Sequence, residues 1–308
     1  MPSPAPLRPG DTIAIVPTAR AIMRDELTEG IELAKSWGLN VKLGSCIGRK
    51  HYQQAGTARQ RAADLQAALE DPNVKAVWCA RGGYGTVHLL DHIDLEAFTR
   101  NPKWVVGFSD VTVLHNTLHG LGLPSVHAQM PFNIGSKSDD ARESLRRALF
   151  GEHLSISMRH PESAPEPRLG EGEGTLVGGN LSLLYALRGT PFDIEPAGKI
   201  LFIEDLDELL YHVDRMVTNL RISGWFSQLA GLIVGGMTEM RDKDPKDPYG
   251  KSAEQIVADA IGDAGYPVCY GFPAGHIADN RALVMGQKAK LSVTASGATL
   301  SFVESGVV

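Results

Sequence analysis

A serine stands at a turn in the segment GFSDV at 107–111. The apolar residues before it predict a strand, and those after it predict a helix. A serine at a tight strand-to-helix turn has the geometry of a nucleophile elbow, in which the next N–H stabilises an oxyanion. The match to GxSxG is incomplete, because Val111 replaces the second glycine. Helix capping by Ser109 or Asp110 is the competing explanation, since both residue types cap helices well.

A glycine cluster, RGGYG at 81–85, follows another predicted strand. Consecutive glycines allow a sharp turn and bring backbone N–H groups close to an anion, whether a phosphate or an oxyanion. The cluster matches neither GxGxxG nor GxxxxGK[ST], so a nucleotide site is only weakly indicated. A turn without any ligand remains open on this segment alone.

A serine nucleophile needs a base, and the base needs an orienting acid. His276 lies in a glycine-flanked loop, GFPAGH at 271–276, and Glu204 ends the apolar run at 199–204. Each has a plainer explanation: a loop histidine can be merely exposed. The acidic run at 204–208 can complement the dipole of the following helix. The helix dipole explains Glu204 less well, because Glu204 still belongs to the predicted strand.

Metal and cofactor chemistry are not indicated. The sequence has no HExxH and no His-x-His motif, and its three cysteines, Cys46, Cys79 and Cys269, have no CxxC spacing. We expect the cysteines to be buried small hydrophobic residues in a reducing compartment. We therefore expect no metal and no cofactor.

The elements that would position these residues alternate between strand and helix in the first half. This rhythm predicts a doubly wound, mostly parallel sheet with functional turns at the carboxyl ends of its strands. The second half predicts a smaller, mixed α/β domain. A stretch rich in proline, glycine and glutamate separates them, so we expect domains at 1–160 and 176–308 with a linker at 161–175. In the first half, strands are predicted at 11–17, 39–43, 74–80 and 104–107, and helices at 24–37, 57–70 and 111–118.

The composition of the chain argues against two kinds of binding partner, nucleic acid and membrane. The chain has 308 residues and a formal net charge of −6, which argues against a nucleic-acid partner. No apolar run approaches the roughly 18 residues that a membrane span requires. The N-terminal segment has no apolar core typical of a secretion signal, so we expect a cytoplasmic protein.

Five strings in order make the sequence resemble the LD-carboxypeptidase family, the serine peptidases that include muramoyltetrapeptide carboxypeptidases and microcin C self-immunity proteins. The resemblance covers roughly residues 10 to 295. It implies two α/β domains, the second with a barrel-like core, an active site between them and a homodimer. The strings are CARGGYG at 79–85, GFSDVT at 107–112, GGNL at 178–181, IED at 203–205 with DRM at 214–216, and GFPAGH at 271–276.

The resemblance also assigns roles. The Ser-Glu-His triad falls on Ser109, Glu204 and His276, and the oxyanion donors are the backbone N–H groups of Gly83 and Asp110. Arg81 and Tyr84, on the glycine turn, are the candidate substrate contacts. Arg81 would pair with the α-carboxylate of the substrate, although an arginine that only pins the turn to nearby carbonyls fits equally well.

The implied reaction is removal of the terminal D-Ala from murein tetrapeptides through an acyl-enzyme. One alternative within the same chemistry is hydrolysis of peptidyl- or aminoacyl-nucleotides, as in the microcin relatives. That alternative needs an aromatic platform for the base, for which Trp225, Phe226 or Tyr249 are candidates. A second alternative is a two-domain module that binds a small anion without catalysis.

Overall fold

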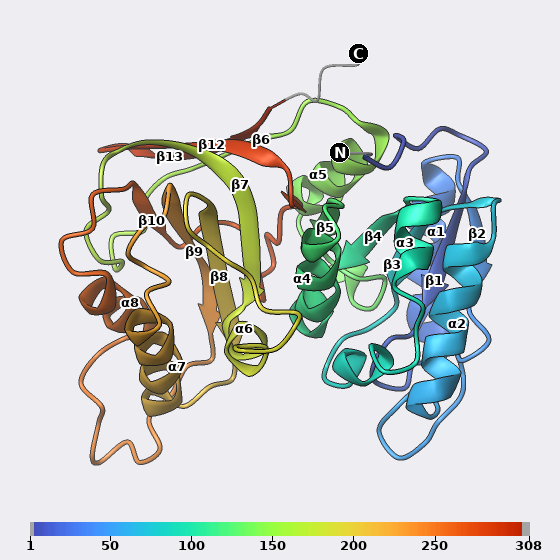
Figure 1. Cartoon of the computed structure of the whole chain (residues 1–308), viewed down its shortest axis with the longest axis horizontal. Coiled ribbons are helices and arrows are strands. Elements are labelled where there is room, and N and C mark those ends of the chain that lie inside the picture. Colours follow the sequence, from blue (N-terminus) through green and yellow to red (C-terminus); the bar gives the residue numbers. More distant parts are fainter. Residues whose placement is uncertain (1–2, 304–308) are drawn as a thin grey trace. The chain divides into compact units, whose positions relative to one another are not determined.

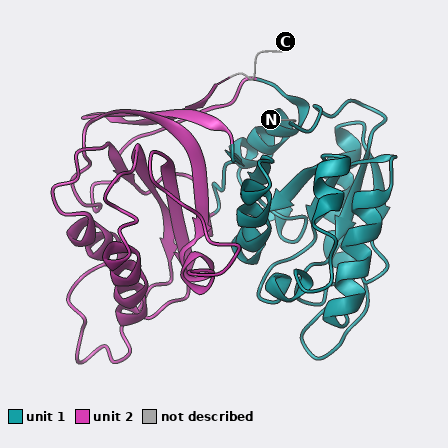
Figure 2. Cartoon of the chain, in the orientation of Figure 1, with its two compact units in different colours: residues 1–152, 278–286 teal, residues 153–277, 287–308 magenta. Residues whose placement is uncertain are grey.

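The computed structural model describes residues 3–303, which form two compact units (Figure 2). Unit 1 takes the chain up to residue 152 together with 278–286. Unit 2 takes 153–277 and the chain from 287 on.

Unit 1 is built on a six-stranded sheet in the order β11-β5-β4-β3-β1-β2. Its pairs are parallel except for β5 with β11, which are antiparallel. The predicted mostly parallel sheet is therefore confirmed. The strands are β1 (Thr12–Val16), β2 (Asn40–Leu43), β3 (Val74–Cys79), β4 (Trp104–Gly107), β5 (Ser125–His127) and β11 (Leu283–Met285).

The helical segments of unit 1 follow the strands in the expected alternation. Helix α2 begins with a capping box, in which Thr57 and Gln60 satisfy each other's backbone N–H groups. The segment after the glycine cluster forms only a short 3-10 turn. The segments are η1 (Asp25–Leu27), α1 (Thr28–Ser36), α2 (Ala58–Glu70), η2 (Thr86–Leu89), α3 (Glu96–Arg100), η3 (Ser109–Val111), α4 (Thr112–Gly120), η4 (Ile134–Ser136) and α5 (Asp139–Phe150).

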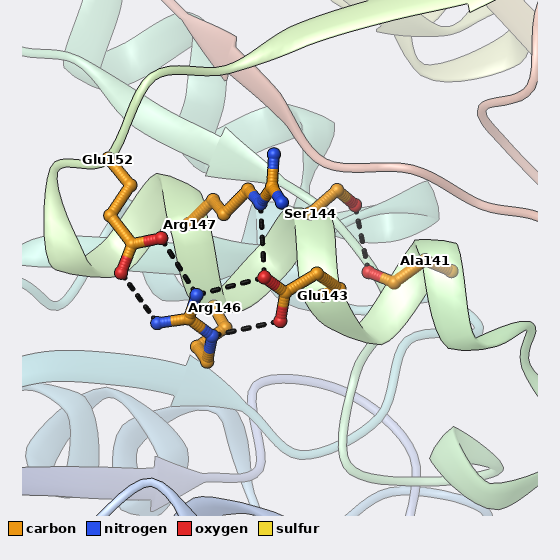
Figure 3. Close-up of polar contacts among 6 residues, drawn as sticks. All are labelled: Ala141, Glu143, Ser144, Arg146, Arg147 and Glu152. Carbon is orange, nitrogen blue, oxygen red and sulfur yellow. Dashed lines mark hydrogen bonds and ion pairs between the residues drawn. The ribbon is translucent and has the colours of Figure 1, made fainter.

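Helix α5 was not among the predicted elements. Ser138 caps its N-terminus by accepting a hydrogen bond from Ala141 N, and Gly151 ends it in the left-handed region at φ 69°. Arg146 lies between Glu143 and Glu152 (Figure 3). Its Nη2 is 2.8 Å from Glu143 Oε1, and its Nη1 is 2.6 Å from Glu152 Oε1. These partly exposed ion pairs join the last turns of α5 to Glu152, just after the helix, and each contributes at most about 1 kcal/mol.

Unit 2 is built on a seven-stranded mixed sheet in the order β10-β9-β8-β7-β12-β13-β6. Strand β7 is long and bent (Figure 1), pairing in parallel with β8 and antiparallel with β12. An isolated antiparallel bridge joins Arg168, just before β7, to Val268 of β10. This bridge connects the two sides of the β7–β10 part of the sheet. The strands are β6 (Ser155–Met158), β7 (Gly170–Asn180), β8 (Ile200–Leu206), β9 (Gly231–Thr238), β10 (Val268–Tyr270), β12 (Lys288–Thr294) and β13 (Gly297–Phe302).

Three helices belong to unit 2: α6 (Leu181–Ala186), α7 (Leu210–Ile222) and α8 (Ala253–Ile261). Their apolar faces join the buried residues of β7 to β10 in one core cluster. Trp225 and Phe226 belong to this cluster and are 3% and 6% exposed. Burial of such large side chains contributes about 1.5–3 kcal/mol each to folding.

The expected linker at 161–175 is not a separate segment, because β7 already begins at Gly170. The unit boundary lies near residue 152 rather than 160, and residues 278–286 return to unit 1. Composition misled the expectation, since glycine-rich sequence usually indicates a loop. Here glycine is required: a Cβ at Gly172 would lie 1.8 Å from the carbonyl oxygen of Ala230.

Candidate active site

Ser109 has φ 62°, in the left-handed region that non-glycine residues rarely adopt. It stands directly after β4 and Phe108 and opens η3, which leads into α4. Gly107 makes this turn possible, since a Cβ there would come within 2.8 Å of Val111 Cγ2. Strained backbone of this kind concentrates at functional sites, and a strand, a strained serine and a helix together form a nucleophile elbow.

The structure does not favour the capping explanation for this serine. The N-cap of α4 is Val111, and no side chain caps it. The N-cap of η3 is Phe108, again without a side-chain cap. Neither Ser109 nor Asp110 therefore stands at a cap position.

The Asp110 side chain instead joins the serine turn to the glycine cluster. It is fully buried and accepts hydrogen bonds from Thr86 N at 2.9 Å and Gly85 N at 3.3 Å. Burial raises the pKa of Asp110, and the hydrogen bonds from Thr86 and Gly85 and the nearby charge of Arg61 oppose that rise. The carboxylate thus ties the two turns into one unit.

Arg61, on α2, holds the glycine turn to the segment after β1. Its guanidinium is 2% exposed and donates to the carbonyl oxygens of Gly85, at 3.0 Å, and Thr18. No sequence pattern points to this arginine, because it lies in an alanine-rich helix and acts only through tertiary contacts.

The glycine cluster adopts backbone angles that need glycine. Gly83 has φ 110° and Gly85 has φ 131°. A Cβ added to Gly82 would lie 3.6 Å from Ser109 Cβ, so the turn passes directly beside the serine. This closeness is what an oxyanion hole built on the turn requires.

Arg81 is held by partners within unit 1. It donates to the carbonyl oxygen of Ala21 at 3.3 Å, lies 3.7 Å from Glu26, and stacks 4.2 Å above the Phe132 ring. These contacts match the structural explanation for this residue. Tyr84 is 53% exposed, with its ring edge-on to His88.

Two buried histidines lie behind the serine turn. His115 Nε2 is 3.0 Å from the carbonyl oxygen of Gly107, and Nδ1 is 2.8 Å from Ser125 Oγ. Burial lowers the pKa of His115 to about 4, so the ring is neutral at neutral pH. A neutral ring donates from Nε2 to Gly107 and accepts from Ser125. His127, on β5, lies near the rings of both His115 and Phe108, with centroid distances of 6.0 and 5.8 Å.

In unit 2, Glu204 and His276 form a close pair. Glu204 Oε2 lies 2.6 Å from His276 Nδ1 and also accepts a hydrogen bond from His276 N at 3.2 Å. Glu204 is fully buried, whereas the His276 side chain is 14% exposed. The geometry is that of an acid that orients a base and stabilises its imidazolium.

Glycines create the space for this pair. Gly275 has φ 105°, and a Cβ there would lie 2.7 Å from Glu204 Oε2. On β9, Gly235 and Gly236 stand opposite the register shift around Glu204, and Gly236 N donates to the carbonyl oxygen of Ala274. Bulges of this kind re-aim side chains beside active sites.

Asp205 anchors the start of α6 beside the pair. It accepts hydrogen bonds from Asn180 Nδ2 at 2.7 Å and Ser182 N at 2.9 Å. Burial and the charge of Glu204 raise the pKa of Asp205 to about 7. The later acids of the run pair with side chains away from His276: Asp207 with Arg241, far along the chain, and Glu208 with His212, four residues on.

Other expectations concern what the chain lacks. Cys46, Cys79 and Cys269 are free and buried, as expected. Over residues 3–303, no group of three or more His, Cys, Asp or Glu side chains is placed to hold a metal ion. No helix in this same range is long and apolar enough to span a membrane.

Comparison with known proteins decides the family. Residues 13–128 match the LD-carboxypeptidase N-terminal domain, and residues 173–291 match the LD-carboxypeptidase C-terminal domain. A probable murein peptide carboxypeptidase of Bacillus subtilis is 36% identical over 99% of this chain and 95% of its own length. The chain belongs to the LD-carboxypeptidase family. It is therefore a serine hydrolase.

Two further relatives of this LD-carboxypeptidase agree. A murein tetrapeptide carboxypeptidase of Pseudomonas aeruginosa is 32% identical over 91% of this chain and 92% of its own. The crystal structure of muramoyltetrapeptide carboxypeptidase from Oxalobacter formigenes has a TM-score of 0.84 at 29% identity, covering 94% of this chain and 98% of that one. The predicted family and its two-domain α/β fold are confirmed, and the non-catalytic binding module is excluded.

Proposed function

We propose that this LD-carboxypeptidase removes the terminal D-Ala from murein tetrapeptides, using Ser109 as nucleophile, His276 as base and Glu204 as orienting acid. The 2.6 Å contact between Glu204 Oε2 and His276 Nδ1 carries the proposal, because it gives the base the acid partner that a triad needs. The strained turn at Ser109 supports the role of the nucleophile. The relatives named for murein peptides support the substrate.

The proposed reaction begins when His276 Nε2 takes the proton of Ser109 Oγ and Oγ attacks the carbonyl carbon of the L,D peptide bond. The backbone N–H groups of Gly83 and Asp110 hold the oxyanion. The imidazolium, stabilised by Glu204, then gives its proton to the leaving D-Ala nitrogen, and the C–N bond breaks. Water activated by His276 hydrolyses the acyl-enzyme and regenerates the serine.

The nucleotide-linked alternative loses two of its three candidate platforms. Trp225 and Phe226 pack in the core of unit 2, where their faces are not available for stacking a base. Tyr249, in the polar loop, is 39% exposed and is the remaining candidate. This burial favours the tetrapeptide as substrate.

The direct test is to incubate the wild-type protein with a murein tetrapeptide and, separately, with an aminoacyl-nucleotide, and to identify the products by mass spectrometry. We expect the tetrapeptide to lose one D-Ala and the nucleotide to remain intact. Cleavage of the nucleotide alone would overturn the proposed substrate. The expected homodimer and cytoplasmic location stay predictions, and light scattering would test the first.

A further inference from the structure

Three cationic residues line a pocket in unit 1. Arg20, Lys50 and Arg81 surround a volume of about 520 Å³, together with Ala21, Tyr52 and Gln53. No acidic residue is in this lining, although the whole chain carries a net charge of −6. A concave surface lined by one sign of charge raises the local concentration of ligands of the opposite sign. The pocket therefore fits an anionic group.

Backbone hydrogen bonds hold the walls of this pocket together. The segment after β1 joins the segment near residue 53 through Ala21 N to Gln53 O, at 2.9 Å. Gln54 forms a bridge with Arg20, and its Nε2 donates to the carbonyl oxygen of Tyr84 at 2.9 Å. The pocket thus lies at the carboxyl ends of β1 and β3, where ligands bind in sheets of this kind.

Tyr52 adds a second observation at the rim. It is 84% exposed and has φ 53°, a conformation that is costly for a bulky residue. Such strain marks sites where a side chain is held for a purpose other than packing. Tyr52 stands beside Lys50 and Gln53 on the pocket lining.

The pocket adjoins the proposed oxyanion turn. The Arg20 side chain crosses Gly83 so closely that a Cβ there would lie 2.2 Å from Arg20 Cδ. Gly82, the neighbouring glycine, is the one whose Cβ would lie 3.6 Å from Ser109 Cβ. The turn at Gly82 and Gly83 therefore lies next to Ser109 on one side and next to the Arg20 side chain on the other.

The three cations differ in how they are paired. Arg81 is engaged by Glu26 and by the carbonyl oxygen of Ala21. Within residues 3–303, Arg20 and Lys50 take part in no ion pair. These two are the cations that a ligand would meet.

We propose that Arg20 and Lys50 bind the free α-carboxylate of the substrate's C-terminal residue. The inference rests on the proposed function, since it takes Gly83 N–H as the oxyanion donor. The scissile carbonyl and that carboxylate belong to adjacent residues, whose Cα atoms are about 3.8 Å apart. A carbonyl held at Gly83 therefore places the carboxylate beside the side chain that crosses Gly83.

This assignment gives the enzyme its exopeptidase character. The fork of an arginine matches a carboxylate with two parallel hydrogen bonds, and a lysine adds a point charge. Other carboxylates of a murein peptide are several bonds further from the scissile carbonyl. A peptide that continues past the cut, or whose end is amidated, would leave both cations without an anionic partner.

The test compares a tetrapeptide with the same peptide amidated at its C-terminus. Calorimetry measures the binding of each peptide to three inactive proteins: Ser109→Ala alone, Ser109→Ala with Arg20→Met, and Ser109→Ala with Lys50→Met. Arg24→Met is the matched control, because Arg24 is a nearby exposed arginine outside the pocket lining. Turnover of both peptides by the wild type is measured in parallel.

We expect Ser109→Ala to bind the free acid at least about 10-fold more tightly than the amide, as charge-assisted hydrogen bonds are strong. Arg20→Met should remove most of this preference, Lys50→Met part of it, and Arg24→Met none. Equal binding of acid and amide, no binding of either, or a preference that survives both substitutions would overturn the pocket assignment. If the preference is found and depends on Arg20, but the wild type hydrolyses neither peptide, the proposed reaction fails while the carboxylate site stands.

Discussion

The carboxylate of Asp110 accepts a hydrogen bond from the backbone N–H of Thr86 at 2.9 Å, and the two residues belong to turns at the ends of different strands. One turn carries Ser109 and the other carries Gly83. The side chain of Asp110 thus sets the distance between the proposed nucleophile and one proposed oxyanion donor, while its own N–H is the other donor.

Asp110→Asn should therefore lower kcat about 10- to 100-fold with a smaller change in KM. An amide can accept from Thr86 or Gly85 but presents its NH₂ group to the other donor, which loosens the glycine turn. Losing one oxyanion donor outright costs about 10²–10³ in kcat. Steady-state kinetics on the tetrapeptide measures the effect, with Asp91→Asn, an exposed acid after η2, as control. An unchanged kcat in Asp110→Asn would show that the tie has no role in catalysis.

Glu204→Gln tests the acid of the proposed triad. Glutamine is nearly isosteric but carries no charge, so it cannot stabilise the His276 imidazolium and can present its amide to Nδ1. We expect kcat to fall about 10³- to 10⁴-fold, as in triads that lose their acid. Asp207→Asn, on the same acidic run but 60% exposed, should stay within about twofold of wild type, since asparagine tolerates its φ of 61° and only a surface contact changes. Activity of Glu204→Gln within tenfold of wild type would remove Glu204 from the mechanism.

Gly275→Ala tests the space that the acid–base pair needs. The new Cβ would meet Glu204 Oε2 at 2.7 Å and Glu204 Cβ at 2.8 Å, at a residue whose φ of 105° already disfavours alanine. We expect a loss of at least about 10² in kcat, because displacements of about 1 Å in a catalytic group cost that much. Gly265→Ala is the matched control in unit 2, since a Cβ there meets nothing within 4 Å. Equal activity of the two variants would contradict the close packing of Gly275 on Glu204.

The stability of the protein should depend on pH through His115. Its folded pKa of about 4 lies below the unfolded value near 6.5, so the folded state binds fewer protons between these values. The contribution is complete above pH 6.5 and is lost as the pH falls toward 4. His115→Gln, which keeps a donor and an acceptor, should show a smaller drop in urea midpoint between pH 7 and pH 5 than the wild type. Parallel drops in the two proteins would refute this role.

Much of the fold is predictable from local sequence. The strands β1, β3 and β4 begin and end within a residue or so of their predicted bounds, because short β-branched or apolar runs with clear ends allow little else. Strand β7 was missed, since its glycines and glutamates become a strand only by pairing with β8 and β12. Helix α5 was missed although Ser138 and Gly151 cap it.

Some residues of the candidate site could likewise be predicted from the sequence, and others could not. Ser109 and the glycine cluster could be proposed from their positions at strand ends, and Glu204 and His276 could be paired only through the family resemblance. The 2.6 Å contact now places that acid and base together within unit 2. The side chains of Asp110, Arg61 and Arg20 gave no signal, because their roles depend on contacts between segments far apart in the chain.

The central claim, that the Ser109 hydroxyl is the nucleophile, is tested most directly by the turnover of tetrapeptide in Ser109→Ala and Ser109→Gly. Glycine accepts the φ of 62° without strain, so Ser109→Gly should be more stable than Ser109→Ala by about 1 kcal/mol. The account predicts that both variants lose at least about 10³-fold in kcat despite this difference in stability. Activity in Ser109→Gly within tenfold of wild type would mean that the hydroxyl is not required, and would contradict the account.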